Sequence, residues 1–349
     1  MDIKTEIFGE KDGQPVHLIK MKNENGLQIS CINYGCIITE ILTPDKKGQM
    51  ENVVLGFDSM DEYDRYSPYF GAVVGRVAGR IKNGSFDLDG KKYHLAQNEN
   101  RNHIHGGNKG FSHALWDYEL FQKENEIGIE FSYISSDGEE VYPGNLAMKV
   151  TYTFNNRDEF TISYFGISDK KTIVNMTNHS YFNLSGDLKR DILEHEITLK
   201  SHQFLELNDQ LLPTGNLINV DGTVFDFRSG RKLKEGVQSR HPQIALAGNG
   251  YDHPFILNTN HQKEIILADE ESGRRLIVET DEPCVVLYTG NNIMNEFSIR
   301  GVQAKKHLGV CLETQHPPDA IHHQHFPSVA LEKGKEYHSK TKYTFTLQI

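Results

Sequence analysis

A histidine within a polar stretch is the first residue of this sequence whose type and surroundings suit catalysis. His179 lies in residues 175–184, NMTNHSYFNL, between Asn178 and Ser180 and ahead of an aromatic pair. Amide and hydroxyl groups can fix the tautomer of an imidazole or bind a hydroxylated ligand, and an imidazole transfers protons near neutral pH. A structural histidine that ties a loop to a strand fits this stretch equally well.

A carboxylate at the end of an apolar segment is a candidate partner for that histidine. Glu313 ends the apolar run of residues 307–315, HLGVCLETQ, and two prolines follow it. In a strand, alternation places Glu313 on the same face as Cys311, among buried residues. Burial raises the pKa of a carboxyl group and makes its anion a stronger base. Because an unpaired buried carboxylate is costly, a functional role is favoured for Glu313.

Two further charged residues stand beside glycines and admit two interpretations each. Arg80 lies in residues 75–81, GRVAGRI, where its guanidinium can hold sugar oxygens or a carboxylate, or bond loop carbonyls. Asp252 lies in residues 248–254, GNGYDHP, where it can accept hydrogen bonds from ligand hydroxyls. Aspartate also caps its own turn commonly, and the residues alone favour that structural role for Asp252.

Residues 102–107, NHIHGG, place two histidines two positions apart. In an extended chain His103 and His105 share one face, as in a metal site built on an HxH pair. No glutamate follows three or four residues later to complete a ligand set, so a metal ion is not favoured. The other interpretation is that one histidine binds a ligand while the glycines let the chain turn close beside it.

Short segments of alternating apolar and polar residues must position these groups. They occur over residues 27–42, 85–95, 126–132, 149–165, 264–278 and 342–349, and polar turns divide 85–95, 149–165 and 264–278 into paired segments. This pattern predicts an all-β fold, a large antiparallel β-sandwich, in a single domain over residues 1–349. Short helices are expected only near 59–66, where Ser59 opens a capping box, and near 229–236.

Composition excludes several classes of protein. The 349 residues carry 48 acidic and 37 basic side chains, a net charge of -11, without a basic cluster, so a nucleic-acid partner is not expected. No segment has the roughly 18 consecutive apolar residues of a membrane helix, and residues 1–6 are not followed by the apolar region of a signal peptide. The four cysteines form no CxxC pair, which predicts buried reduced thiols in a cytoplasmic protein.

Seven motifs in one order resemble the aldose 1-epimerase (galactose mutarotase) family, and the resemblance covers nearly the whole chain. The motifs are GRVAGRI at 75–81, NHIHGG at 102–107, DGEEVYPGNL at 137–146, TNHSYFNL at 177–184, YDH at 251–253, YTGN at 288–291 and ETQHPPDA at 313–320. Each motif is weak alone, but seven in the order of the family make a specific match.

The resemblance implies a large antiparallel β-sandwich with the sugar in an open cleft. It implies interconversion of the α and β anomers of a free aldose such as galactose or glucose, with no cofactor and no metal. Glu313 matches the base, His179 the acid and His105 a residue that assists binding and charge stabilisation. Arg80 and Asp252 match positions that hold sugar hydroxyls. The oligomeric state stays open between monomer and homodimer.

Two departures from the family pattern bear on the sugar. Gly79 stands where the family usually has asparagine, and Val141 stands where it often has glycine. These two departures bear on which aldose is preferred more than on which reaction is catalysed. The main alternative is a non-catalytic sugar-binding or sugar-sensing module on the same fold. A metal enzyme that uses His103 and His105, or a hexose-phosphate epimerase, would need ligands or a basic cluster that the sequence does not display.

Overall fold

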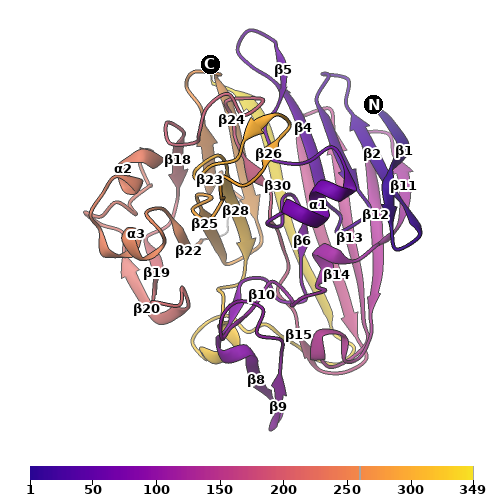
Figure 1. The fold of residues 1–349 in the computed structure, drawn as a ribbon, viewed down its shortest axis with the longest axis vertical. Helices are drawn as coiled ribbons and strands as arrows, with labels where there is room; N and C mark the ends of the chain where they lie inside the picture. The colour runs from indigo at the N-terminus through magenta and orange to yellow at the C-terminus, as the bar shows by residue number, and fades with distance from the viewer. Residues whose placement is uncertain (259–260, 349) are drawn as a thin grey trace.

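Three antiparallel sheets form most of the protein (Figure 1). The computed structural model describes residues 1–258 and 261–348. In spatial order, the nine-stranded sheet consists of β11 (Asp117–Gln122), β12 (Glu126–Ser135), β13 (Leu146–Asn155), β14 (Glu159–Ser168), β30 (Glu336–Leu347), β24 (Arg274–Thr280), β23 (Ile265–Ala268), β18 (Glu196–Leu199) and β21 (Arg231–Lys232). This sheet is one layer of the sandwich.

The second layer combines the two other sheets. The five-stranded sheet contains β1 (Asp2–Lys11), β2 (Gln14–Lys22), β3 (Gln28–Ile32), β4 (Ile38–Pro44) and β5 (Met50–Asn52). The six-stranded sheet runs through β17 (Tyr181–Phe182), β28 (Val310–Gln315), β25 (Cys284–Tyr288), β22 (Asp252–Ile256), β19 (Gln203–Leu207) and β20 (Pro213–Asn219). A bridge between Val54 and Phe182 and a hydrogen bond from Leu55 N to Tyr181 O join the two sheets.

The hydrophobic core lies between these layers because alternate side chains of each strand point inward. Ile127, Ile129 and Phe131 of β12 are all fully buried, as their spacing predicts. They belong to one cluster with Ile29 of β3 and Leu312 of β28, so residues of all three sheets share this core. The predicted β-sandwich is thereby confirmed.

The turns between paired strands follow the sequence closely. Asp89 and Gly90 have φ of 50° and 77° and connect β8 (Ser85–Leu88) to β9 (Lys91–His94), as the Asp-Gly pair predicts. The expected hairpins of β13 with β14 and of β23 with β24 are present. The last strand, β30, pairs on both sides, with β14 and β24, and so joins the two halves of the large sheet; residue 349 of the predicted segment lies outside the described residues.

Further short strands pair outside the three large sheets. They are β6 (Val73–Val74) with β16 (Thr177–Asn178), β7 (Arg80–Ile81) with β10 (His103–Ile104), β15 (Thr172–Ile173) with β29 (Ala330–Leu331), and β26 (Ser298–Ile299) with β27 (Val302–Gln303). In helix α1 (Met60–Tyr66), Ser59 caps the N-terminus by accepting a hydrogen bond from Glu62 N, which confirms that expectation. The segment near 229–236 begins as strand β21 and becomes α2 (Leu233–Val237), and α3 (Pro242–Leu246) was not predicted. Among the described residues, no helix is long and apolar enough to cross a membrane.

Candidate active site

A cleft of about 170 Å³ opens over the six-stranded sheet and brings the predicted site residues together. Arg80, His105, His179, Asp252 and Glu313 all line it. Its walls also include Tyr69, Gly79, Glu99, Tyr181, Leu207, Tyr288, Gln315 and Pro318. The cleft therefore combines titratable groups with apolar and aromatic walls, the composition of a small-molecule site.

Glu313 reaches the cleft from β28, an inner strand of the six-stranded sheet. Strand β28 pairs with β25 so that Glu313 lies opposite Val286. Its side chain is only 5% exposed, as the alternation of the strand predicts. Burial raises the pKa of Glu313 well above its usual value, the negative charge of Asp252 raises it further, and Arg80 opposes both.

His179 sits between the short strands β16 and β17 and is held by its own backbone. Its N–H donates to Ala72 O at 2.8 Å, and its carbonyl accepts from Gly71 N at 3.1 Å. The imidazole stacks against Tyr181 at a centroid distance of 5.0 Å. Burial lowers the pKa of His179 to about 4. The aromatic neighbour thus shields one side of the ring, as the stretch predicts.

The polar neighbours of His179 support the loop and do not orient the imidazole. Asn178 donates to Gly71 O at 2.9 Å and accepts from the Ser180 hydroxyl at 2.6 Å. The atom beside Nδ1 of His179 is instead Sγ of Cys311, at 3.5 Å. The idea that amide and hydroxyl groups fix the tautomer is therefore wrong, because both side chains are used up in binding the adjacent backbone and each other.

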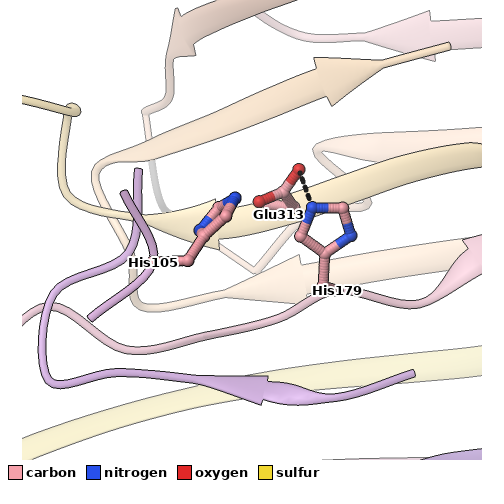
Figure 2. Close-up of side chains that lie close together, drawn as sticks. All are labelled: His105, His179 and Glu313. Atoms are coloured by element: carbon pink, nitrogen blue, oxygen red, sulfur yellow. Dashed lines mark ion pairs between the residues drawn. The ribbon is translucent and has the colours of Figure 1, made fainter. Parts of the chain in front are cut away.

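The two candidates for proton transfer, His179 and Glu313, face each other directly. Nε2 of His179 lies 3.5 Å from Oε1 of Glu313 (Figure 2). A lowered pKa makes an imidazolium a stronger acid, and a raised pKa makes a carboxylate a stronger base. Both shifts arise from burial, which disfavours either charged form. The pair can accordingly exist as a carboxylate with an imidazolium or, after one proton has moved, as a neutral carboxylic acid with a neutral imidazole.

His105 approaches Glu313 from the other side, in the turn after β10 (Figure 2). Its Nδ1 accepts a hydrogen bond from the Gly79 backbone N–H at 3.3 Å. Since a backbone amide can only donate, the proton of the neutral ring must be on Nε2. Burial lowers the pKa of His105 well below its usual value, so the neutral ring is the stable form. His105 is thus a fixed hydrogen-bond donor.

His103 does not pair with His105 in a metal site. Its Nδ1 lies 2.8 Å from Ala96 O and its Nε2 2.7 Å from the Tyr142 hydroxyl, so protein groups occupy both nitrogens. The backbone at His105 has φ of 52°, which breaks the extended alternation that would put both rings on one face. The two glycines after it, Gly106 and Gly107, also have positive φ, as a close turn requires.

A different set of groups has the proximity of a metal site. Ligand atoms of His105, His179 and Glu313 all lie within 4.8 Å of one another. In His105, however, the lone pair of Nδ1 accepts the hydrogen bond from Gly79 N–H, and Nε2 carries the ring proton. Neither nitrogen then has a lone pair available for a metal ion. The ring would have to give up this hydrogen bond to bind a metal ion. The arrangement favours hydrogen bonding to a ligand over coordination.

Arg80 and Asp252 also line the cleft and form a charged network with Glu99. Arg80 donates to Glu99 through Nε at 2.6 Å and Nη2 at 2.7 Å, and its Nη1 lies 3.6 Å from Oδ2 of Asp252. Asp252 is the first residue of β22 and lines the cleft, so the favoured turn-capping role is wrong. Burial raises the pKa of Asp252 to about 6, against the opposing charge of Arg80.

Arg76, and not Arg80, is the arginine of this motif that binds loop carbonyls. The guanidinium of Arg76 is 2% exposed and donates to the carbonyls of Pro143, Ser135, Ser136 and Gly144. The two arginines of GRVAGRI therefore differ in function: Arg76 holds the loops, and Arg80 faces the cleft. Their spacing of four residues does not reveal which is which.

Two cleft residues carry no clear signal in the sequence. Glu99 lies in a polar run that reads as a loop, and Tyr69 follows a proline in another loop. Both reach the cleft because the loops that carry them fold back over the sheet.

The departures at positions 79 and 141 also have structural consequences. Gly79 has φ of 73°, and a Cβ there would lie 2.9 Å from Cβ of Pro318, so the proline ring occupies the space of a side chain. Val141 has φ of 72°, in the left-handed region that favours glycine. A β-branched residue is rare at this backbone conformation.

Comparison with known proteins decides the family. The sequence profile described as Aldose 1-epimerase matches residues 17–344. The chain belongs to the aldose 1-epimerase family. The galactose mutarotase of Bos taurus is 42% identical over 92% of each chain, and that of Homo sapiens is 40% identical over 98% of each. This membership makes the chain an isomerase.

A solved structure of an aldose 1-epimerase family member agrees. The galactose 1-epimerase of Lactobacillus acidophilus NCFM superimposes with a TM-score of 0.89 at 28% identity, over 100% of this chain and 99% of that one. The fold implied by the resemblance is therefore confirmed along the whole described chain. The cleft described above is the candidate active site of this aldose 1-epimerase family member.

Proposed function

We propose that this aldose 1-epimerase family member interconverts the α and β anomers of a free aldose such as galactose or glucose. The observation that carries the proposal is the 3.5 Å contact between His179 and Glu313 at the base of a cleft. Ring opening of a cyclic aldose needs a base for the anomeric hydroxyl and an acid for the ring oxygen. This pair supplies both without a cofactor.

The reaction proceeds in two mirrored halves. The Glu313 carboxylate takes the proton of the anomeric hydroxyl while the His179 imidazolium gives its proton to the ring oxygen. The bond between C1 and the ring oxygen breaks, and the open-chain aldehyde forms. Rotation about C1–C2 exposes the other face of the carbonyl, and the two proton transfers reverse to close the ring. Each positioned proton transfer typically contributes about 10²–10⁴-fold.

Burial of the pair favours the ring-opening direction. The step converts a carboxylate and an imidazolium into a neutral acid and a neutral imidazole. Burial raises the pKa of Glu313 and lowers that of His179 to about 4, so both neutral products are stabilised. Ring closure reverses both proton transfers, so Glu313 becomes a carboxylate again and His179 an imidazolium. The site thereby returns to its starting state.

The other cleft residues are proposed to bind and orient the sugar. The Nε2–H of His105 can donate to a sugar oxygen beside Glu313 and stabilise charge that develops there. Asp252 can accept hydrogen bonds from sugar hydroxyls, and Arg80 can donate to them from its remaining N–H groups. The ion pair with Glu99 holds the Arg80 guanidinium in place.

The proposal is tested by exchange NMR on equilibrated galactose, glucose, xylose and arabinose. We expect faster exchange between the anomers of at least one aldose with the protein than without it. Tight binding of a sugar without faster exchange would instead indicate a sugar-binding module. If no aldose exchanges faster, the assignment fails. The ranking of rates reports the preferred aldose, which the Pro318 wall beside Gly79 helps to select.

We also propose a single cytoplasmic domain. One core shared by all three sheets supports a single folding unit, testable as one cooperative transition in denaturant. The four cysteines are buried as free thiols, which fits a reducing compartment. Light scattering distinguishes a monomer from a homodimer.

A further inference from the structure

The turn that follows Pro68 is attached directly to the backbone of His179. The N–H of Ala72 closes the turn by donating to Tyr69 O at 3.0 Å. Gly71 N donates to His179 O, and His179 N donates to Ala72 O, so the turn and the histidine are joined by two reciprocal hydrogen bonds. A displacement of this turn would consequently displace His179.

The Tyr69 ring at the start of this turn contacts both imidazoles of the site. Its centroid lies 4.7 Å from that of His105, edge-on, and 5.8 Å from that of His179, nearly parallel. The two imidazoles themselves are 5.2 Å apart. Three rings therefore form one packed group, and Tyr69 is the member that carries no proton-transfer role in the proposed reaction.

The backbone of Tyr69 is in an unfavourable conformation for a large side chain. Its φ is 67°, in the left-handed region that non-glycine residues rarely adopt. The surrounding hydrogen bonds and the burial of Phe70, which is 0% exposed, hold it there. Such strain concentrates at functional sites because the surrounding structure must enforce it.

A second cavity lies on the far side of this ring. It has a volume of about 160 Å³ and is lined by Tyr34, Ser67, Ser112 and His113 together with Tyr69. Tyr69 is the residue that lines both this cavity and the cleft. Without the ring, the polar cavity and the cleft would be connected, and water would reach the imidazoles from behind.

We infer that Tyr69 is a positioning residue that holds the imidazoles of His105 and His179 in their cleft geometry and separates them from the neighbouring polar cavity. The inference rests on the proposed function, because it assigns Tyr69 to the same proton-transfer site. The ring acts through packing and water exclusion, so its hydroxyl group is dispensable. Burial lowers the pKa of both imidazoles, and the ring contributes to that burial.

Three replacements separate the ring from the hydroxyl and from the backbone strain. Tyr69→Phe keeps the ring, Tyr69→Ala removes it, and Tyr69→Gly removes it while also relieving the strain at positive φ. Tyr66→Ala is the matched control, because its ring belongs to the same segment but contacts Phe57 and Phe297. Circular dichroism and denaturant unfolding establish which variants are folded.

Two measurements test the inference. In anomer-exchange NMR, we expect Tyr69→Ala and Tyr69→Gly to lower kcat by about 10–100-fold, the cost of misplacing catalytic groups, with a smaller change in KM. Tyr69→Phe and Tyr66→Ala should remain near the wild-type rate. In NMR titrations of the imidazoles without sugar, assigned with His105→Asn and His179→Asn, removal of the ring should move both pKa values upward.

The outcomes are distinguishable from failure of the proposed function. If the wild type does not exchange anomers but ring removal still shifts both titrations, the positioning role stands and the enzymatic proposal falls. If the wild type is active while folded Tyr69→Ala and Tyr69→Gly keep its rate and its titrations, the inference is overturned. It is also overturned if Tyr69→Phe loses as much activity as Tyr69→Ala.

Discussion

His179 Nε2 and Glu313 Oε1 lie 3.5 Å apart, although the two residues come from segments far apart in the sequence. The strand pairing of β17 with β28 explains this proximity, since Tyr181 lies opposite Cys311, and each catalytic candidate is two residues from that pair. The register of these two strands therefore places the candidate acid and the candidate base side by side.

Removal of either proton-transfer group should abolish most activity. We expect Glu313→Gln and His179→Asn each to lower kcat by about 10²–10⁴-fold, because neither amide can exchange a proton at neutral pH. Ser180→Ala is the control, since this hydroxyl binds Asn178 and not the cleft. Anomer-exchange rates at saturating sugar give the comparison, and near-full activity in a folded variant would remove that residue from its assigned role.

Replacement of Arg80 should weaken sugar binding, whereas replacement of Arg76 should lower the stability of the fold. Arg80→Lys loses the two-pronged contact with Glu99, and we expect KM to rise about 10-fold, the equivalent of about 1.4 kcal/mol in binding. Arg76→Lys loses several hydrogen bonds to buried loop carbonyls, so we expect a lower free energy of unfolding. Kinetics and urea unfolding of both variants check this, and a wild-type KM in Arg80→Lys would contradict it.

Three buried histidines should make the fold sensitive to acid. Burial lowers the pKa of His179 and of His195 to about 4, and that of His253 to about 3. Between these values and the ordinary value near 6.5, the unfolded chain binds protons that the folded chain does not. The contribution of these three histidines to stability is therefore fully present above about pH 6.5 and is lost as pH falls toward 4.

Urea midpoints measured from pH 7 to pH 4.5 test this dependence. His253→Gln should make the midpoint fall less steeply, because it removes one of the three groups. His94→Gln, a replacement at an exposed position, is the control and should leave the slope unchanged. A midpoint that rises on acidification would show that the sign is wrong.

The strained valine offers a route to greater stability. Val141 has φ of 72° and is 45% exposed, so Val141→Gly relieves strain while losing little buried surface. We expect the free energy of unfolding to rise by about 1 kcal/mol. Val141→Ala keeps a Cβ and should gain less. Urea unfolding measures both, and a destabilised glycine variant would refute the argument.

Much of the fold could be predicted from alternation and turn chemistry. The run around Ile127 and Ile129 reads as a half-buried strand, and the Asp89-Gly90 pair reads as a hairpin turn, because both signals act within a few residues. The α3 helix and the short strand β21 escaped prediction. Their few residues are ordered by tertiary contacts that outweigh weak local preferences.

The candidate site was predictable to a different extent. Glu313 stands out because a carboxylate in an apolar strand needs a reason, and His179 and His105 stand out through their motifs. Glu99 and Tyr69 do not, since a loop residue acquires its role from where the loop folds. The structural role of Arg76 was likewise invisible, because its partners are carbonyl groups of distant loops.

By itself the sequence determined the all-β class and the family, and it supplied candidates for an acid, a base and the sugar-binding residues. Only the tertiary structure decided that Nδ1 of His105 accepts the Gly79 amide, that Arg80 pairs with Glu99, and that Tyr69 packs against both imidazoles. The reason is physical. Strand patterns depend on neighbours along the chain, whereas tautomers, ion pairs and pKa values depend on neighbours in space.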